Sequence, residues 1–307
     1  MATHAHGIEG VLAQANRPFY RRSAASTYRF VRQYPLGAIG AFFVIMLIAM
    51  AISPELFTPF STQSGTKQAI SDRLSGPSAA HWFGTDELGR DVYARIIYGA
   101  RTSIIIGFGV VMVSQALAIT FGTLSGFRGG TFDMIFQRVV DIGIAVPGLV
   151  FIILAVRTLA GHIGDQFAIV LSLSLLIAAS SSRTVRGVAL SITTEQYVDA
   201  ARALGAHDLR VMLRHIVPNL TAIAIVSASI LVGTAVLIES SLSFLGYGVQ
   251  PPAPSWGRML NDARQQMIRA PHLAIFPGLV IFLTVYSFNM LGDALRDKLD
   301  PRLRGSR

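Results

Sequence analysis

The residue types that usually carry out catalysis do not fall into a catalytic arrangement anywhere in this sequence. A phosphate-binding loop needs glycines followed directly by a lysine, but neither Lys67 nor Lys298 follows a glycine. The seven histidines show no His-Glu-x-x-His spacing, and no Gly-x-Ser-x-Gly elbow is present. The absence of cysteine excludes thiol catalysis, disulfides and Cys-metal sites. We therefore expect no catalytic residue, no metal site and no cofactor bound by this chain.

One polar segment, residues 195–219, lies between two apolar stretches and is the strongest functional candidate. It has the pattern of two short helices around one glycine. Thr193 and Gln196 have the spacing of a capping box that would start the first helix, and Gly205 supplies a left-handed stop. On pattern alone, the segment fits a solvated hairpin between membrane spans as well as it fits a partner-binding element.

The second helix of this hairpin is expected to be amphipathic. Asp208 is placed to cap it, and Pro218 is expected to interrupt it. Arg202, Arg210 and Arg214 would line the edges of its apolar face. The apolar residues that recur at helical spacing and would form one stripe are Leu209, Met212, Leu213 and Ile216.

The composition indicates an integral membrane protein. Of the 307 residues, 52% are hydrophobic and 14% are charged, whereas soluble domains carry roughly 25% charged residues. A helix needs about 20 mostly apolar residues to cross the hydrocarbon of a bilayer. The apolar runs that reach or approach this length are residues 36–52, 102–127, 142–156, 166–182, 216–238 and 270–292. We therefore expect an all-α integral membrane protein with about six transmembrane helices.

The placement of basic residues predicts the orientation of these spans. Lys and Arg collect on the cytoplasmic side of membrane proteins. If the N-terminus is inside, 17 of the 26 Lys and Arg residues are cytoplasmic and nine are outside. Both termini and the polar hairpin are therefore expected in the cytoplasm. The net charge of +9 includes a basic N-terminal arm, for which we expect anionic membrane lipid, and not nucleic acid, as the partner.

This topology divides the chain into parts. The first apolar run has 17 residues and a leader of 35, both longer than in a signal peptide, so we interpret it as an uncleaved span. The expected parts are a cytoplasmic N-terminal basic arm (1–35), the first transmembrane helix (36–52), an extracytoplasmic segment (53–101), a transmembrane core (102–292) that contains the hairpin (193–219), and a cytoplasmic C-terminal tail (293–307).

Polar side chains within the spans are candidates for a translocation path. Glu239 lies near the end of the fifth span, Ser243 follows one turn later, and Asn289 lies within the sixth. Ionisable residues at membrane depth are costly and usually functional. Glu239 could equally lie at the outer interface, and Asp141 is expected to pair with Arg138 at the cytoplasmic edge.

Small residues and prolines predict how the spans pack and bend. Gly122 and Gly126 have the spacing that lets two helices approach closely. The pairs Pro147-Gly148 and Pro277-Gly278 predict kinks in the third and sixth spans. Such kinks would give a gate two states or would only fit a curved bundle.

The hairpin resembles the EAA loop, the cytoplasmic hairpin by which inner-membrane subunits of ABC importers contact their ATPase. The resemblance rests on Asp199-Ala200-Ala201, Gly205 and Pro218, with Asp199 in place of the Glu that gives the loop its name. Further blocks resemble the C-type permease of the dipeptide, oligopeptide and nickel ABC importer family, whose transmembrane domain is methionine-importer-like. They occur in the family's order at residues 81–91, 241–246, 250–259 and 289–297, and the resemblance covers about residues 36–302.

The resemblance implies a multi-pass permease subunit of the inner membrane that forms, with a homologous permease, the path for peptides or related small solutes. It also implies two cytoplasmic ATPase subunits that hold ATP and Mg, and an extracytoplasmic solute-binding protein. An ion-coupled secondary transporter is the alternative; it would favour paired intramembrane carboxylates. The residues that the resemblance assigns to ATPase coupling are Tyr197, Asp199, Ala200, Ala201, Leu204, Gly205, Leu209, Arg210, Met212, Leu213 and Pro218.

Overall fold

The computed structural model of the protein describes residues 28, 30–58 and 66–299, and its regular elements there are all helical. The expected all-α architecture is therefore confirmed. Most of the N-terminal basic arm and residues 300–307 of the C-terminal tail lie outside the described residues. In chain order the elements are α3 (Pro35–Ile52), two 3-10 turns (Pro54–Leu56 and Ile70–Asp72), α4 (Val92–Arg128), α5 (Gly130–Ala145), α6 (Gly148–Ile163), α7 (Asp165–Thr193), α8 (Gln196–Ala203), α9 (Asp208–Val211), a π-helical turn (Met212–Ile216), α10 (Val217–Phe244), α11 (Trp256–Ala263) and α12 (His272–Leu299).

Five helices in the described part of the chain are long and apolar enough to cross a membrane. They are α3, α4, α7, the continuous helix Asp208–Phe244, and α12. A sixth span exists only if α5 and α6 are counted together, and these two helices are bent by 92°. The kink predicted at Pro147-Gly148 in the third span is therefore present, but it is a complete break between two helices and not a bend within one.

The break between α5 and α6 has a local cause. Pro147 comes just before α6, and Val146 has an extended backbone with φ −75° and ψ 132°. A proline sterically disfavours the helical conformation of the residue before it. The Pro147-Gly148 pair thus ends one helix and starts another, whereas Pro277 lies inside the continuous helix α12.

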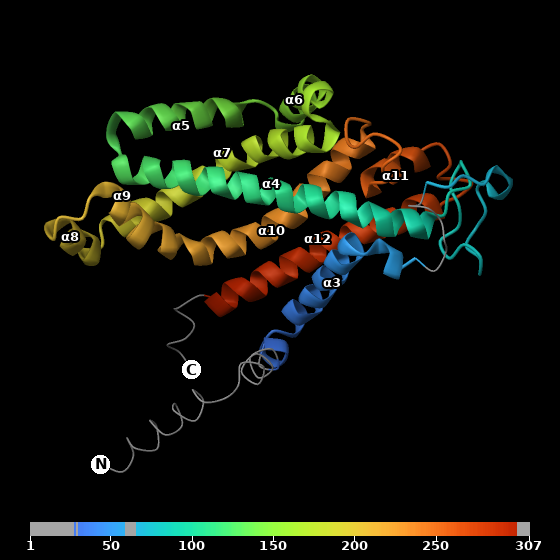
Figure 1. Ribbon diagram of the computed structural model, residues 1–307, viewed down its shortest axis with the longest axis horizontal. Coiled ribbons are helices and arrows are strands. Elements are labelled where there is room, and N and C mark those ends of the chain that lie inside the picture. The colour runs from blue at the N-terminus through green and yellow to red at the C-terminus, as the bar shows by residue number, and fades with distance from the viewer. Residues whose placement is uncertain (1–27, 29, 59–65, 300–307) are drawn as a thin grey trace, which may run out of the picture.

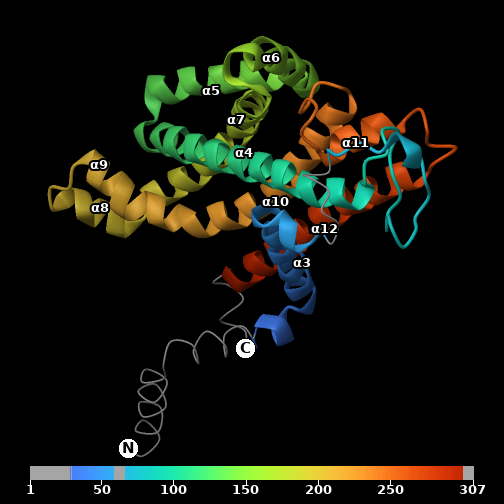
Figure 2. The same ribbon diagram turned by 45° about the vertical axis from the view of Figure 1, so that its right-hand side comes forward.

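The helices alternate in direction between two distinct ends of the molecule. Figure 1 shows α8 and α9 at one end, and α11 with the segment that precedes α4 at the other. Helices α4, α7 and α12 run toward the α8–α9 end, and α10 runs away from it. In Figure 2, α5 lies along α4 and α7, while α6 turns across the bundle.

Close packing of α4 on α7 positions the α8–α9 end. A Cβ added at Gly122 would lie 2.6 Å from the carbonyl oxygen of Ser182, and one added at Gly126 would lie 2.9 Å from that of Arg186. The expected close approach at this glycine pair is therefore present. Both acceptor residues belong to α7, which leads directly into the polar hairpin.

Candidate functional site: an exposed hairpin and a buried carboxylate

The turn of the hairpin depends on Gly205. Its φ is +83°, its N–H donates to the carbonyl of Arg202 at 2.9 Å, and the N–H of Ala206 donates to the carbonyl of Ala201 at 3.0 Å. This pair of bonds is the Schellman arrangement that satisfies the last carbonyls of a helix. The predicted left-handed stop at Gly205 is confirmed.

The predicted helix caps of the hairpin are wrong. Thr193 is the last residue of α7, and its hydroxyl donates to the carbonyl of Leu190 at 2.7 Å and does not cap α8. The residue before α8 is Glu195, which makes no side-chain cap. At α9 the cap is His207, whose Nδ1 accepts the N–H of Arg210 at 3.2 Å, so Asp208 is the first helical residue.

The second helix does not stop at Pro218. A π-helical turn over Met212–Ile216 joins α9 to α10, and the N–H of Val217 donates to the carbonyl of Met212, five residues earlier. Proline lacks an N–H and crowds the preceding turn of an α-helix. The wider π turn ends at Ile216, and Pro218 lies in the first turn of α10, where a missing N–H is tolerated. The helix therefore continues into the membrane span.

The hairpin has one face that anchors it and one that is free. Val198, Val211 and Ile216 are completely buried in a cluster with α4, α7 and α10. The predicted stripe is split, because Leu209 and Leu213 are exposed while Ile216 is buried and Met212 is half-buried. The π turn explains the split, since its larger number of residues per turn rotates Ile216 away from the face of Leu209.

The free face combines apolar and charged side chains. The exposed fractions of its apolar residues are 89% for Leu204, 60% for Leu213, 58% for Leu209 and 44% for Tyr197. The coupling candidates Asp199, Ala200, Gly205, Arg210 and Pro218 are also exposed, and Ala201 is half-buried.

A bond between the two helices closes the base of the hairpin. The side-chain amide of Asn219 donates to the Tyr197 hydroxyl at 3.3 Å and to the carbonyl of His215 at 2.6 Å. Sequence reasoning did not single out Asn219, although it is the only asparagine in the polar segment 195–219. The bond links the start of α8 to the start of α10, so the hairpin is tied to its membrane helix.

The path candidates fall into two separate places. Glu239 is completely buried inside the protein, and its carboxylate accepts from the hydroxyls of Ser243 at 2.7 Å and of Ser103 in α4 at 3.4 Å. Glu239 lies five residues before the end of α10, so it is enclosed by protein near one end of its helix. Asn289 is half-buried on α12, and its neighbour Phe288 packs against Gly233, earlier along α10 than Glu239.

Comparisons with known proteins give the family. Residues 118–305 match the model of the family described as binding-protein-dependent transport system inner membrane component. The glutathione transport system permease protein GsiD of Pectobacterium atrosepticum is 41% identical over 277 residues, which cover 90% of each chain. The protein of the same name from Escherichia coli O157:H7 is 39% identical over 278 residues, or 90% of this chain and 89% of the relative.

The chain belongs to this family. It is therefore an inner-membrane, multi-pass permease subunit of a binding-protein-dependent ABC importer, and not an enzyme.

Acidic side chains on α5 of the permease pair with arginines of α7. Asp141 lies 3.9 Å from Arg138, as expected, and is also bonded to Arg183. Asp133 makes a two-pronged pair with Arg186. These pairs neutralise the charged positions of α5, which explains how a helix with two aspartates can lie along the bundle.

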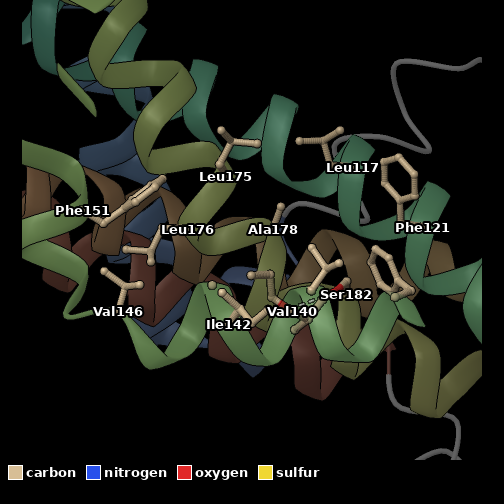
Figure 3. A pocket seen from close by; sticks show the side chains of 14 residues that line it. Leu117, Phe121, Val140, Ile142, Val146, Phe151, Leu175, Leu176, Ala178 and Ser182 are labelled. Atoms are coloured by element: carbon tan, nitrogen blue, oxygen red, sulfur yellow. Dashed lines mark hydrogen bonds between the residues drawn. The ribbon is translucent and has the colours of Figure 1, made fainter. Parts of the chain in front are cut away.

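An apolar cavity of about 380 Å³ lies where α5 and α6 meet α4 and α7. Figure 3 shows Phe121, Ile142, Phe151 and Leu176 among the side chains that line it. Ser182 is the one polar side chain among its lining residues and none is charged, so the cavity suits an apolar group better than a polar solute. Among the described residues no cluster of His, Asp or Glu could hold a metal ion.

Proposed function

We propose that the permease forms a translocation path together with a second, homologous permease, with two cytoplasmic ATPase subunits beneath the pair and a solute-binding protein above it. The membership of a binding-protein-dependent family supports the last of these partners. The lack of any phosphate-binding loop in the sequence supports separate ATPases that hold ATP and Mg. The orientation that we propose has both termini and residues 193–219 in the cytoplasm and residues 53–101 outside.

One observation carries the proposal of ATPase docking: the free face of the hairpin exposes leucines on the polar segment 195–219, and Leu204 lies between the spans Asp165–Thr193 and Asp208–Phe244. Leu204 is 89% exposed, and the charged residues on either side of it, Asp199, Arg202, Asp208 and Arg210, make the segment too polar to enter lipid. Complete burial of a leucine side chain is worth about 1.5–3 kcal/mol. Leu204, Leu209 and Leu213 therefore fit an apolar groove on a partner, with Arg202 and Arg210 at its rim.

The anchored face of the hairpin supports a route for transmitting ATPase movement. Val198 packs from α8, and Val211 and Ile216 from the helix that continues into α10, against the end of α7. A displacement of the hairpin would move α7 and α10 together, because close-packed interiors do not absorb such shifts. Helix α10 carries Glu239, which is bonded to Ser103 of α4, so the displacement would reach the far half of the bundle.

The solute that we propose is a small peptide or a related compound. The relatives named above are glutathione transport proteins, and glutathione is a peptide-like molecule with carboxylates and an amino group. Selectivity would be shared with the binding protein, which meets the solute first.

The test compares two exposed leucines at opposite ends of the molecule. Leu204→Glu is expected to lower co-purification of the ATPase by about tenfold or more, because a charge then enters the apolar groove. Leu56→Glu is the matched control, since Leu56 is 82% exposed beside the far end of α3. Equal ATPase yield from the two variants, with both inserted in the membrane, would refute docking through this face.

A further inference from the structure

A polar pocket of about 330 Å³ lies at the end of the molecule opposite the hairpin. It is bordered by the segment before α4, by the first turn of α4 and by α11 (Figure 1). Its charged lining residues are Asp86, Glu87, Arg90, Arg95, Arg258 and Asp262. A concave site of this size with a few convergent polar groups has the usual dimensions of a small-molecule site.

The two aspartates of this pocket are already engaged by two of its arginines. Asp86 accepts the Nε–H of Arg90 at 2.6 Å, and its other oxygen accepts the N–H groups of Leu88 and Arg90 at 2.9 Å each. Asp262 accepts the Nε–H of Arg258 at 3.0 Å. Neither carboxylate is within hydrogen-bonding distance of the third arginine, Arg95.

Arg95 makes only long ion pairs with these two aspartates. Its side chain is only 3% exposed, its Nε lies 3.6 Å from Asp86, and its Nη2 lies 3.9 Å from Asp262. Its Nη1 is enclosed and has no hydrogen-bond partner among the described residues. A buried charged donor without an acceptor is costly, so the pocket suits an anionic group that none of the described residues supplies. A carboxylate matches the planar fork of a guanidinium.

Glu87 supplies the opposite charge in the same pocket. It is half-buried, it lines the pocket, and it belongs to none of the ion pairs between described residues. An ammonium group would complement it. The pocket therefore offers a guanidinium with only long ion pairs and, among the described residues, a carboxylate outside the ion pairs, and together they suit a zwitterion.

We propose that this pocket binds a small zwitterionic solute, an amino acid or short peptide, with the solute carboxylate on Arg95 and its ammonium group near Glu87. The inference rests on the proposed function, because the solute would be the cargo arriving from the binding protein. It places a holding site on this subunit, away from Glu239 and the hairpin.

The experiment measures equilibrium binding to the permease–ATPase complex without the binding protein. The probes are dialanine, its C-terminal amide and its N-acetyl form. Dialanine is expected to bind in a saturable way, and each blocked form is expected to bind about tenfold or more weakly, because each loses one charge-assisted contact. No saturable binding of dialanine would overturn the proposal.

Matched variants assign the contacts. In Arg95→Gln the preference for dialanine over its amide should vanish, and in Glu87→Gln the preference over the N-acetyl form should vanish. Arg269→Gln, on an exposed arginine that does not line the pocket, should keep both preferences. Both preferences persisting unchanged in Arg95→Gln and Glu87→Gln would overturn the site.

A third variant guards against misfolding, since Arg95 is buried. Gln68 is exposed and lines the pocket, so Gln68→Trp should block binding without disturbing the core. Unchanged dialanine affinity in Gln68→Trp would contradict the pocket.

ATP-driven uptake is measured in parallel with the binding protein present. Normal uptake without binding at this pocket would refute only the proposed holding site. A wild-type complex that shows no ATP-driven uptake would refute the proposed function.

Discussion

The conformation of Gly205 allows a graded prediction about the hairpin. A Cβ added there would meet nothing within 4 Å, so a substitution acts only through the backbone. Its φ of +83° costs an ordinary L-residue roughly 1–2 kcal/mol, less for asparagine. Proline cannot adopt that φ and would also remove the bond from the Gly205 N–H to Arg202, at about 3 kcal/mol or more.

These costs translate into ATPase affinity. If the cost is paid whenever the hairpin takes its docking shape, Gly205→Ala weakens ATPase binding about five- to thirtyfold and Gly205→Pro more than about 100-fold. The assay is titration of the detergent-solubilised permease with purified ATPase, with membrane insertion checked for each variant. Gly246→Ala is the control, because Gly246 has φ +88° and equally open space but lies at the other end of α10.

The loss of ATPase affinity should be smallest for Gly205→Asn, larger for Gly205→Ala and largest for Gly205→Pro. Gly205→Pro binding the ATPase like the unaltered chain would refute it. So would a loss of affinity in Gly246→Ala as large as that in Gly205→Ala, because the effect would then not come from the hairpin.

Three other changes test the bundle and its orientation. Glu239→Ala should lower the free energy of unfolding of the purified permease by about 2 kcal/mol or more. Glu239→Gln should lower it by less, because glutamine keeps the shape of the side chain and can still bond to the serines. Equal losses in the two variants would contradict this. Gly122→Ala should lower the free energy of unfolding by about 1–3 kcal/mol, whereas Gly161→Ala should not, because only the first variant places a methyl group against a backbone oxygen. An unchanged free energy of unfolding in Gly122→Ala would show that α4 and α7 are not in close contact. In intact cells, an impermeant thiol reagent should label Ile268→Cys, at a 99% exposed position, and leave Leu204→Cys unlabelled; the reverse pattern would invert the topology.

The features that sequence predicted best are those decided locally. The glycine stop at Gly205 follows from a conformation that other residues avoid, and the long apolar runs follow from the thickness of the bilayer. The close approach at Gly122 and Gly126 could be predicted because small residues at this spacing in membrane helices usually mark a helix–helix contact.

The features that sequence missed depend on partners far away in the chain. Helix α5 carries the charged Asp133, so its sequence alone does not indicate that it lies along the bundle. The partner that neutralises Asp133 is Arg186, which comes from α7. The buried Arg95 looked like one more basic residue outside the membrane, since only the fold shows that its neighbouring carboxylates are already engaged. The π turn before Pro218 was also missed, because a proline ordinarily signals the end of a helix.

The central claim is that the exposed face around Leu204 docks on a separate ATPase that drives this permease. Because the sequence has no cysteine, a single Leu204→Cys can carry a short photoactivatable cross-linker without background. In the assembled transporter we expect the cross-linked product to contain the ATPase and its yield to change when ATP is added, while the same probe at Leu56→Cys captures no ATPase. ATPase captured equally from both positions, or from neither while ATP-driven uptake proceeds normally, would contradict the account.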